Sequence, residues 1–244
     1  MRQIFDCMGT TISVDCDGTA DDTARVKQIF DGFDRRFSLY RDDSELSRIA
    51  AGNLQLVDSS DSLREVYALA LEWRLSTGGI FTPHRPDGVI DLNGVVKALA
   101  IERSGETLGS NWIVNAGGDI LISGADRVVG IVDPADRDTL LCSLVLAGRR
   151  RAIATSGSAE RGDHIWGRPA EFAQVTVVAD DIMTADVLAT AIIAGGSPTL
   201  DDVTARFDVD VLTVDREGLL RATPGIRTAL ATGQPNSAKT EESL

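Results

Sequence analysis

The sequence predicts an α+β protein in which helices and antiparallel, meandering strands are segregated. Three observations lead to this prediction. Helical spacing of apolar residues dominates residues 21–108, short β-rich runs separated by turns fill residues 119–155, and a strongly apolar helix begins near residue 184. The length of 244 residues suits one large domain or two closely joined lobes.

The elements follow from local patterns, in chain order. Strict alternation predicts a strand at 10–14, and a cap region at Thr19 and Asp21 precedes a helix at 21–33. Further helices are expected from about 44, at 60–76 and at 93–108, and then a strand at 112–115. The runs ILISG, VVGIV, LLCSLVL and RRAIAT predict an antiparallel meander, and a strand at 174–178 precedes the apolar helix.

Two weaker strands are expected near Val209 and Leu219. From about residue 234 the chain is polar and has no periodicity, which predicts a disordered tail over 234–244 behind one domain at 1–233.

Charge and cysteine content exclude several classes of function. The chain has 24 Lys and Arg against 37 Asp and Glu, a net charge of −13, which argues against broad attraction to nucleic acid or anionic membrane. Binding of phosphate groups would therefore depend on local features of the site, such as a divalent cation or helix N-termini. Three cysteines without CxxC spacing predict reduced thiols, and two histidines exclude most zinc and haem schemes.

The N-terminal residues have no basic region followed by an apolar segment, so no signal peptide is predicted. No run is expected to approach the length that spans a bilayer. The sequence as it stands therefore predicts a cytoplasmic protein.

The most informative segment is TADVLATAIIAGG at 184–196. On a helix, Asp186 and Thr190 stack one turn apart on one face, while apolar neighbours surround the axis. A buried lone carboxylate needs compensation, and two hard oxygen ligands suit Mg²⁺, so we interpret the pair as half of a magnesium site. The alternative is that Asp186 reaches solvent at the helix start while Thr190 bonds back to a carbonyl.

Two small-residue segments allow a ligand or a simple turn. Asn115 to Asp119 contain the pair Gly117 and Gly118 between two strands, where backbone can approach a ligand or just reverse direction. The segment ATSGS at 154–158 places Thr155, Ser156 and Gly157 at a strand end. Neither a GxGxxG nor a GxxxxGK motif is present, so neither a Rossmann nor a P-loop phosphate site is predicted.

Three charged or titratable residues are also open to two interpretations. His164 lies in a loop rich in Gly, Asp and Arg, where an imidazole acts as a base or is simply solvated. Lys97 faces a phosphate or is an ordinary surface lysine on its helix. Asp91 is most simply the N-terminal cap of that helix.

The order of these motifs is more specific than any one of them. Along most of residues 4–215 the chain resembles the FAD:protein FMN transferases, often called the ApbE family. The blocks that carry the resemblance are CMGT at 7–10, FSLYRDDSELSRI at 37–49, GGIFTP at 78–83, DLNGVVKALAIER at 91–103, NAGGDILISG at 115–124, and ATSGSAERGDHI at 154–165 with VTVVADDIMTADVLATA at 175–191.

The resemblance implies two closely joined lobes around a nucleotide cleft, and an enzyme that holds FAD with Mg²⁺. Such an enzyme transfers FMN to a Thr or Ser hydroxyl of an acceptor protein and releases AMP. Carried over by position, the implied flavin-nucleotide contacts are Met8, Tyr40, Phe81, Thr82, Asp91 and Lys97, with Gly117, Gly118, Asp119, Thr155, Ser156 and Gly157 lining the cleft. The implied metal ligands are Asp186 and Thr190 with the carbonyls of Gly94 and Ala189, and His164 is the implied catalytic residue.

The chain departs from the family pattern on the acceptor side. Residues 83–90 bridge two blocks that are usually about forty residues apart, residues 166–173 are also short, and Ala98 stands where the family has glycine. Two alternatives to transfer therefore stay open: hydrolysis of FAD to FMN and AMP, and a non-catalytic flavin-binding or carrier protein. An acidic structural domain with a buried cap at Asp186 would require all six matches to be accidental.

Overall fold

The structure, a computed structural model, describes residues 1–157 and 171–231. The strands are β1 (Arg2–Cys7), β2 (Thr10–Cys16), β3 (Trp112–Ala116), β4 (Asp119–Ser123), β5 (Arg127–Val132), β6 (Leu140–Leu146), β7 (Ala152–Gly157), β8 (Phe172–Ala179), β9 (Asp210–Asp215) and β10 (Leu220–Ala222). The helices are α1 (Ala20–Phe37), α2 (Glu45–Ala50), α3 (Asp61–Ser76), α4 (Asn93–Glu106), α5 (Ile182–Arg206) and α6 (Pro224–Ala229), with a 3₁₀ turn, η1, at Leu56–Asp58.

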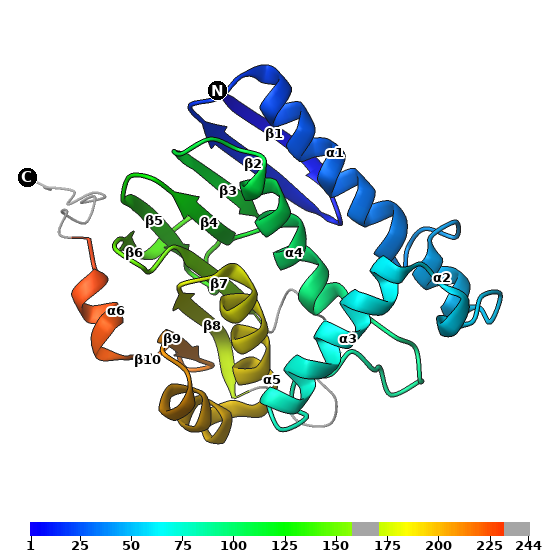
Figure 1. Ribbon diagram of the computed structural model, residues 1–244. Helices are drawn as coiled ribbons and strands as arrows, with labels where there is room; N and C mark the ends of the chain where they lie inside the picture. Colours follow the sequence, from blue (N-terminus) through cyan, green and yellow to red (C-terminus); the bar gives the residue numbers. More distant parts are fainter. Residues whose placement is uncertain (158–170, 232–244) are drawn as a thin grey trace, which may run out of the picture.

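A single eight-stranded sheet organises the molecule. Its order is β1-β2-β3-β4-β7-β8-β9-β10, every neighbouring pair is antiparallel, and β5 and β6 form a separate two-stranded sheet. Helices α1, α4 and α5 cover one face of the large sheet (Figure 1). The predicted α+β class, with antiparallel strands and segregated helices, is confirmed.

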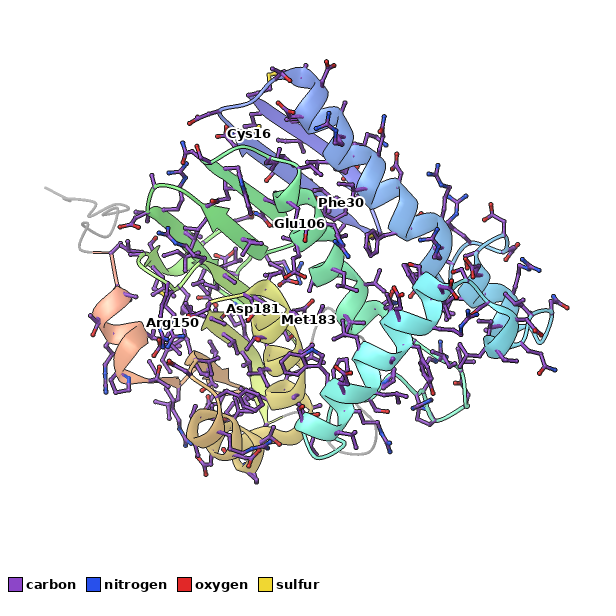
Figure 2. All side chains as sticks on the ribbon, in the orientation of Figure 1. Cys16, Phe30, Glu106, Arg150, Asp181 and Met183 are labelled. Carbon is purple, nitrogen blue, oxygen red and sulfur yellow. The ribbon has the colours of Figure 1, made fainter. Side chains whose placement is uncertain are left out.

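Two hydrophobic clusters lie on opposite faces of the sheet, because alternate residues of each strand point to opposite sides. Ala152 and Ala154 of β7 face the helices, in a cluster that includes Phe30 of α1 and Met183 of α5 (Figure 2). Ile153 faces the other way, where the inner residues of β5 and β6 and Ile226 of α6 pack. The sheet is therefore covered by helices on one side and by a small second layer on the other.

Helices α1, α2 and α3 begin directly after the residues that the sequence indicated as their starts. Thr19 forms a capping box at the start of α1, and Ser44 and Ser60 cap α2 and α3 by accepting hydrogen bonds from backbone N–H groups. Strands β2, β3, β8, β9 and β10 lie where expected. The three cysteines are free thiols, as predicted.

Three expectations about the strands and helices need correction. The meander is interrupted, because β4 pairs with β7 while β5 and β6 leave the sheet and stack on it. Val129 and Ile131 of β5 are buried in the same cluster as Ile153, so the small sheet packs on the face of the large one. Strand β1 and helix α6 had no prediction; β1 has only half-buried residues on its inner side, which gives a weak apolar signal.

Helix α5 is the core helix of the protein, as predicted. It continues beyond the expected apolar run through a kink at Gly196, where φ is 68° and ψ is −157°. By length and composition it is long enough to cross a membrane, which corrects the expectation that no run would be. However, 67% of its most apolar window is buried inside the protein, so core packing explains its composition. Residue His164 and the tail at 234–244 lie outside the described residues.

Candidate active site

The turn between β3 and β4 is built by its glycine pair. Gly117 and Gly118 have φ values of 63° and 99°, which residues with a Cβ rarely adopt. A Cβ at Gly117 would also overlap the Thr10 side chain. The N–H of Gly118 donates to Asn115 Oδ1 at 2.9 Å, and the N–H of Gly117 donates to the Thr11 carbonyl at 3.1 Å. The pair therefore allows close backbone approach, but its two amides are engaged within the protein.

This turn delivers Asp119 into the interior at the first residue of β4. The carboxylate is 1% exposed, its Oδ1 accepts a hydrogen bond from the Thr155 N–H at 3.2 Å, and its Oδ2 pairs with Lys97 Nζ on α4. Burial, and next the nearby Asp186 carboxylate, raise the pKa of Asp119 to about 7, although Lys97 opposes the shift. Lys97 is thus the cationic partner of a buried acid, and its interpretation as an ordinary surface lysine is wrong.

Asp186 and Thr190 lie on the inner face of α5, as their spacing predicted. They are 2% and 7% exposed, and Thr190 Oγ1 lies 3.3 Å from Ser156 Oγ at the end of β7. Asp186 does not reach solvent at the helix start, which was the alternative interpretation, because Asp181 caps α5 instead. Within residues 1–157 and 171–231, Asp186 Oδ2 is buried and accepts no hydrogen bond.

The donor set at this position fits a hard divalent cation. A buried carboxylate oxygen without a hydrogen bond is costly, and a cation compensates it. Asp186, Thr190 and backbone carbonyls are the oxygen ligands that Mg²⁺ prefers. In the described part of the chain no three His, Cys, Asp or Glu side chains converge. A metal here would therefore depend on hydroxyl and carbonyl oxygens in addition to carboxylate, as the prediction that includes Gly94 and Ala189 requires.

The start of α4 carries several predicted contacts. Phe81 is 5% exposed, and a Cβ on Gly94 would come within 2.6 Å of its ring, so glycine is needed where α4 crosses Phe81. Asp91 is not the N-cap residue that the sequence predicted, because Leu92 holds that position. Its Oδ1 instead accepts a hydrogen bond from the Asn93 N–H at 2.9 Å, which satisfies one of the free N–H groups at the helix start. Thr82 is exposed and accepts a hydrogen bond from the His84 N–H at 3.2 Å.

Two predicted contacts lie farther toward the N-terminal strands. Met8 has a φ of 53° in the turn between β1 and β2, beside an open hollow of about 430 Å³ lined by Asp6, Cys7, Gly9, Thr10 and Thr11. Tyr40 is 92% exposed after α1, so its ring is available to a ligand or partner.

A second pocket joins the two small-residue segments that were predicted to line the cleft. Its volume is about 270 Å³. Its lining residues are Gly117, Gly118, Ile120, Gly130, Ile131, Val132, Asp133, Pro134, Arg137, Ile153, Thr155, Gly157, Ala173 and Gln174. Sequence reasoning had placed the glycine turn and the end of β7 here, but it had not foreseen the contribution of β5 and of the loop that follows it.

Comparisons with known proteins agree with this architecture. A family model described as the ApbE family matches residues 8–85 and 84–213. The ApbE protein of Thermotoga maritima has a TM-score of 0.79 at 19% identity, covering 94% of this chain and 98% of that chain. Flavin transferase ApbE from Vibrio cholerae gives 0.73 at 20% identity, with coverage of 94% and 99%. Flavinyl transferase ApbE from Pseudomonas stutzeri gives 0.72 at 18% identity, with coverage of 95% and 98%. A comparison with curated proteins gives no match.

Proposed function

Because the chain belongs to the ApbE family, we propose that it is a transferase that moves the FMN part of FAD onto a Thr or Ser hydroxyl of an acceptor protein, with Mg²⁺, and releases AMP. The observation that carries the proposal is the buried Asp186 carboxylate, whose Oδ2 accepts no hydrogen bond from the described residues. It lies beside Thr190 and near a second buried carboxylate, Asp119. Such a pair of acids attracts a cation, and a pyrophosphate requires one.

The side chains have separable roles in this proposal. Asp186 and Thr190, with the carbonyls of Gly94 and Ala189, would hold Mg²⁺, which neutralises phosphate charge when bound. Lys97 holds Asp119 by an ion pair, and Asp119 in turn receives the Thr155 N–H, so α4, β4 and β7 are fixed relative to one another at the site. The predicted nucleotide contacts Met8, Tyr40 and Phe81 come from the part of the chain that precedes α4.

The proposed reaction is a single displacement at phosphorus. The acceptor oxygen forms a bond to the FMN phosphorus while the bond from that phosphorus to the AMP phosphate oxygen breaks. The proton of the acceptor hydroxyl goes to a base, for which we propose His164. In this scheme the glycine turn lets the backbone come close to the nucleotide. Its N–H groups do not bind the phosphates, because those of Gly117 and Gly118 already donate hydrogen bonds within the protein.

The test is to incubate the protein with FAD and Thr-containing peptides, with and without Mg²⁺. The nucleotides are then separated by chromatography, and the peptide masses are measured by mass spectrometry. Transfer predicts metal-dependent AMP release with an FMN-sized mass gain on a peptide. AMP with free FMN would replace the proposal with FAD hydrolysis. FAD binding without any AMP would replace it with a flavin carrier.

A further inference from the structure

Two aromatic side chains lie beside the predicted nucleotide contact Thr82. Tyr67 of α3 and His84 are both half-buried, and their rings meet edge to face with centroids 5.7 Å apart. Tyr67 Oη lies 2.8 Å from His84 Nε2. The other ring nitrogen, Nδ1, lies 3.5 Å from Thr82 Oγ1. The imidazole is therefore engaged at both nitrogens, by a phenol at one and by the hydroxyl of Thr82 at the other.

The backbone around His84 is held by a short hairpin. His84 forms an antiparallel bridge with Ile90. The N–H of Asp91 donates to the carbonyl of Pro83 at 2.8 Å, which closes the hairpin just before α4. The imidazole therefore has a defined place between α3 and the start of α4, in the segment where this chain is shorter than the family pattern.

The hydrogen bonds around His84 have one favoured direction. A phenol is a stronger donor than an aliphatic hydroxyl, and a neutral imidazole has one nitrogen that accepts and one that donates. We therefore assign Tyr67 as the donor to Nε2 and place the ring hydrogen of His84 on Nδ1, which faces Thr82. Thr82 Oγ1 also accepts a hydrogen bond from the His84 backbone N–H at 3.2 Å. Since a hydroxyl oxygen has two lone pairs and one hydrogen, this exposed hydroxyl can engage a ligand only as a donor.

The surroundings of Thr82 indicate which part of a nucleotide it would meet. The ring of the preceding residue, Phe81, packs against Gly94, whose carbonyl is one of the proposed metal ligands. Arg85, the cation of the same loop, is paired with Asp87 at 2.8 Å. A neutral hydroxyl among aromatic side chains suits an uncharged ring with acceptor atoms better than a phosphate, which prefers cations. The flavin ring of FAD carries carbonyl oxygens, whereas adenine has none.

We propose that Tyr67 and His84 are positioning residues for Thr82, whose hydroxyl donates a hydrogen bond to a carbonyl oxygen of the flavin ring of FAD. This inference rests on the proposed function, in which FAD is the substrate. Tyr67 and His84 do not touch the flavin in this scheme, and they act by fixing the direction in which Thr82 donates. A donor that is oriented before binding raises affinity, because less freedom is lost when the ligand binds.

The test compares the affinity of variants for FAD and for ADP, which has the pyrophosphate and the adenosine but no flavin. Thr82→Val removes the hydroxyl, and Thr82→Ser is the matched control that keeps it. His84→Leu removes the imidazole, whereas His84→Asn keeps an N–H close to the place of Nδ1. Tyr67→Phe removes only the phenol hydroxyl. Titrations contain Mg²⁺ and no acceptor peptide, so that transfer does not proceed, and the visible absorption band of the bound flavin and the Tm are recorded for each variant.

We expect Thr82→Val to weaken FAD binding about fivefold, the effect of roughly one neutral hydrogen bond, and to leave ADP binding unchanged. Thr82→Ser should bind FAD as the unmodified protein does. The absorption band of bound flavin should shift in Thr82→Val and not in Thr82→Ser, because a hydrogen bond to a ring carbonyl alters the electronic structure of the flavin.

The positioning role predicts that the effects of these residues are not additive. His84→Leu should weaken FAD binding about threefold and Tyr67→Phe about twofold, and His84→Asn should recover most of the loss. In the Thr82→Val background none of these changes should have an effect, because the imidazole acts through that hydroxyl. A merely structural role of His84 would lower FAD affinity equally in both backgrounds.

Two results would overturn the inference and leave the transferase proposal standing. One is an equal loss from His84→Leu with and without the hydroxyl of Thr82. The other is a loss of ADP affinity in Thr82→Val as large as the loss of FAD affinity, which would place the contact on the phosphates or the adenosine. Failure of the unmodified protein to bind FAD would instead defeat the proposed function itself, and it is recognised before any variant is made.

Discussion

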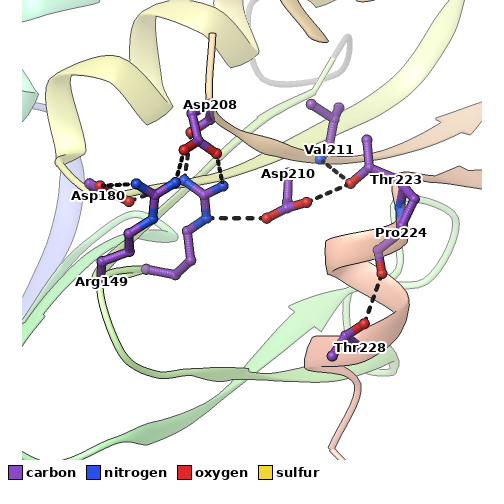
Figure 3. A network of polar contacts seen from close by, with 9 residues as sticks. Arg149, Asp180, Asp208, Asp210, Val211, Thr223, Pro224 and Thr228 are labelled. Carbon is purple, nitrogen blue, oxygen red and sulfur yellow. Dashed lines mark hydrogen bonds and ion pairs between the residues drawn. The ribbon is translucent and has the colours of Figure 1, made fainter.

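Two ionic clusters at opposite ends of β7 carry the same imbalance of charge in different surroundings. Before β7, Arg149 and Arg150 meet Asp180, Asp208 and Asp210 (Figure 3). Near the other end, Lys97 meets Asp119 with Asp186 nearby. Each cluster has one carboxylate more than it has cations.

Burial separates the two clusters. Asp180, Asp208 and Asp210 have side chains that are 47%, 64% and 20% exposed, so water solvates the surplus charge. Asp119 and Asp186 are 1% and 2% exposed. An excess carboxylate without solvent must be protonated or meet a cation. The exposed cluster therefore links the end of β8 to the start of β9, whereas the buried cluster has an excess carboxylate that a proton or a bound cation would neutralise.

The largest expected effect comes from the buried surplus charge itself. Asp186→Asn should reduce Mg²⁺-dependent AMP release about 1,000-fold, equivalent to about 4 kcal/mol, because it removes the charged ligand of the proposed metal site. The metal-free variant should be at least as stable as the unmodified protein, because an uncompensated carboxylate has been removed. Denaturant unfolding with and without Mg²⁺ checks this, since only the unmodified protein should gain stability from the metal. Asp180→Asn is the exposed control, and full AMP release by Asp186→Asn would remove the metal site.

Removing the cation from the same cluster should act in the opposite direction on stability. Lys97→Met leaves Asp119 buried without its ion-pair partner, which should cost about 3 kcal/mol of unfolding free energy at pH 8. The loss should shrink at pH 5, where Asp119 takes up a proton. Urea unfolding at both pH values measures the difference. A loss below about 0.5 kcal/mol at pH 8, the level of surface substitutions, would show that the ion pair is not structural.

The raised pKa of Asp119 gives a third way to separate the clusters. Its ordinary pKa is 3.8 and burial raises the folded-state pKa to about 7, so between these values the folded protein binds the extra proton. The contribution of Asp119 to stability therefore falls as pH rises through this window. Subtracting the pH profile of Asp119→Asn from that of the unmodified protein isolates the effect. A difference that rises with pH over this range would contradict the assignment.

The parts of this site that depend on one helix or one turn could be predicted from the sequence. Asp186 and Thr190 share a face because four residues make about one helical turn, and that face is buried as the apolar neighbours indicated. The Gly117–Gly118 turn was also evident. The pairing of Lys97 with Asp119 was not, because it depends on where α4 crosses the sheet, and no local spacing encodes a contact between separate elements.

The strands show the same division between local and long-range information. The pattern of β5 marks it as a strand, but nothing local states that β4 will pair with β7 and leave β5 outside the sheet. Thus the pocket and its second wall became visible only with the tertiary structure.

The exposed cluster should yield the smallest effects, graded by burial within it. The Arg149 side chain is 60% exposed, and Arg149→Met should change unfolding free energy by less than about 0.5 kcal/mol, because solvent screens the pair. The Arg150 side chain is 20% exposed, and its Nε donates a hydrogen bond to Asp210 Oδ2 at 3.2 Å. The other oxygen of Asp210, Oδ1, accepts a hydrogen bond from Thr223 Oγ1. Arg150→Met should therefore cost about 1.5 kcal/mol. Urea unfolding at low and high salt measures both; equal losses would show that burial does not decide what these charges contribute, and AMP release should stay unchanged in each variant.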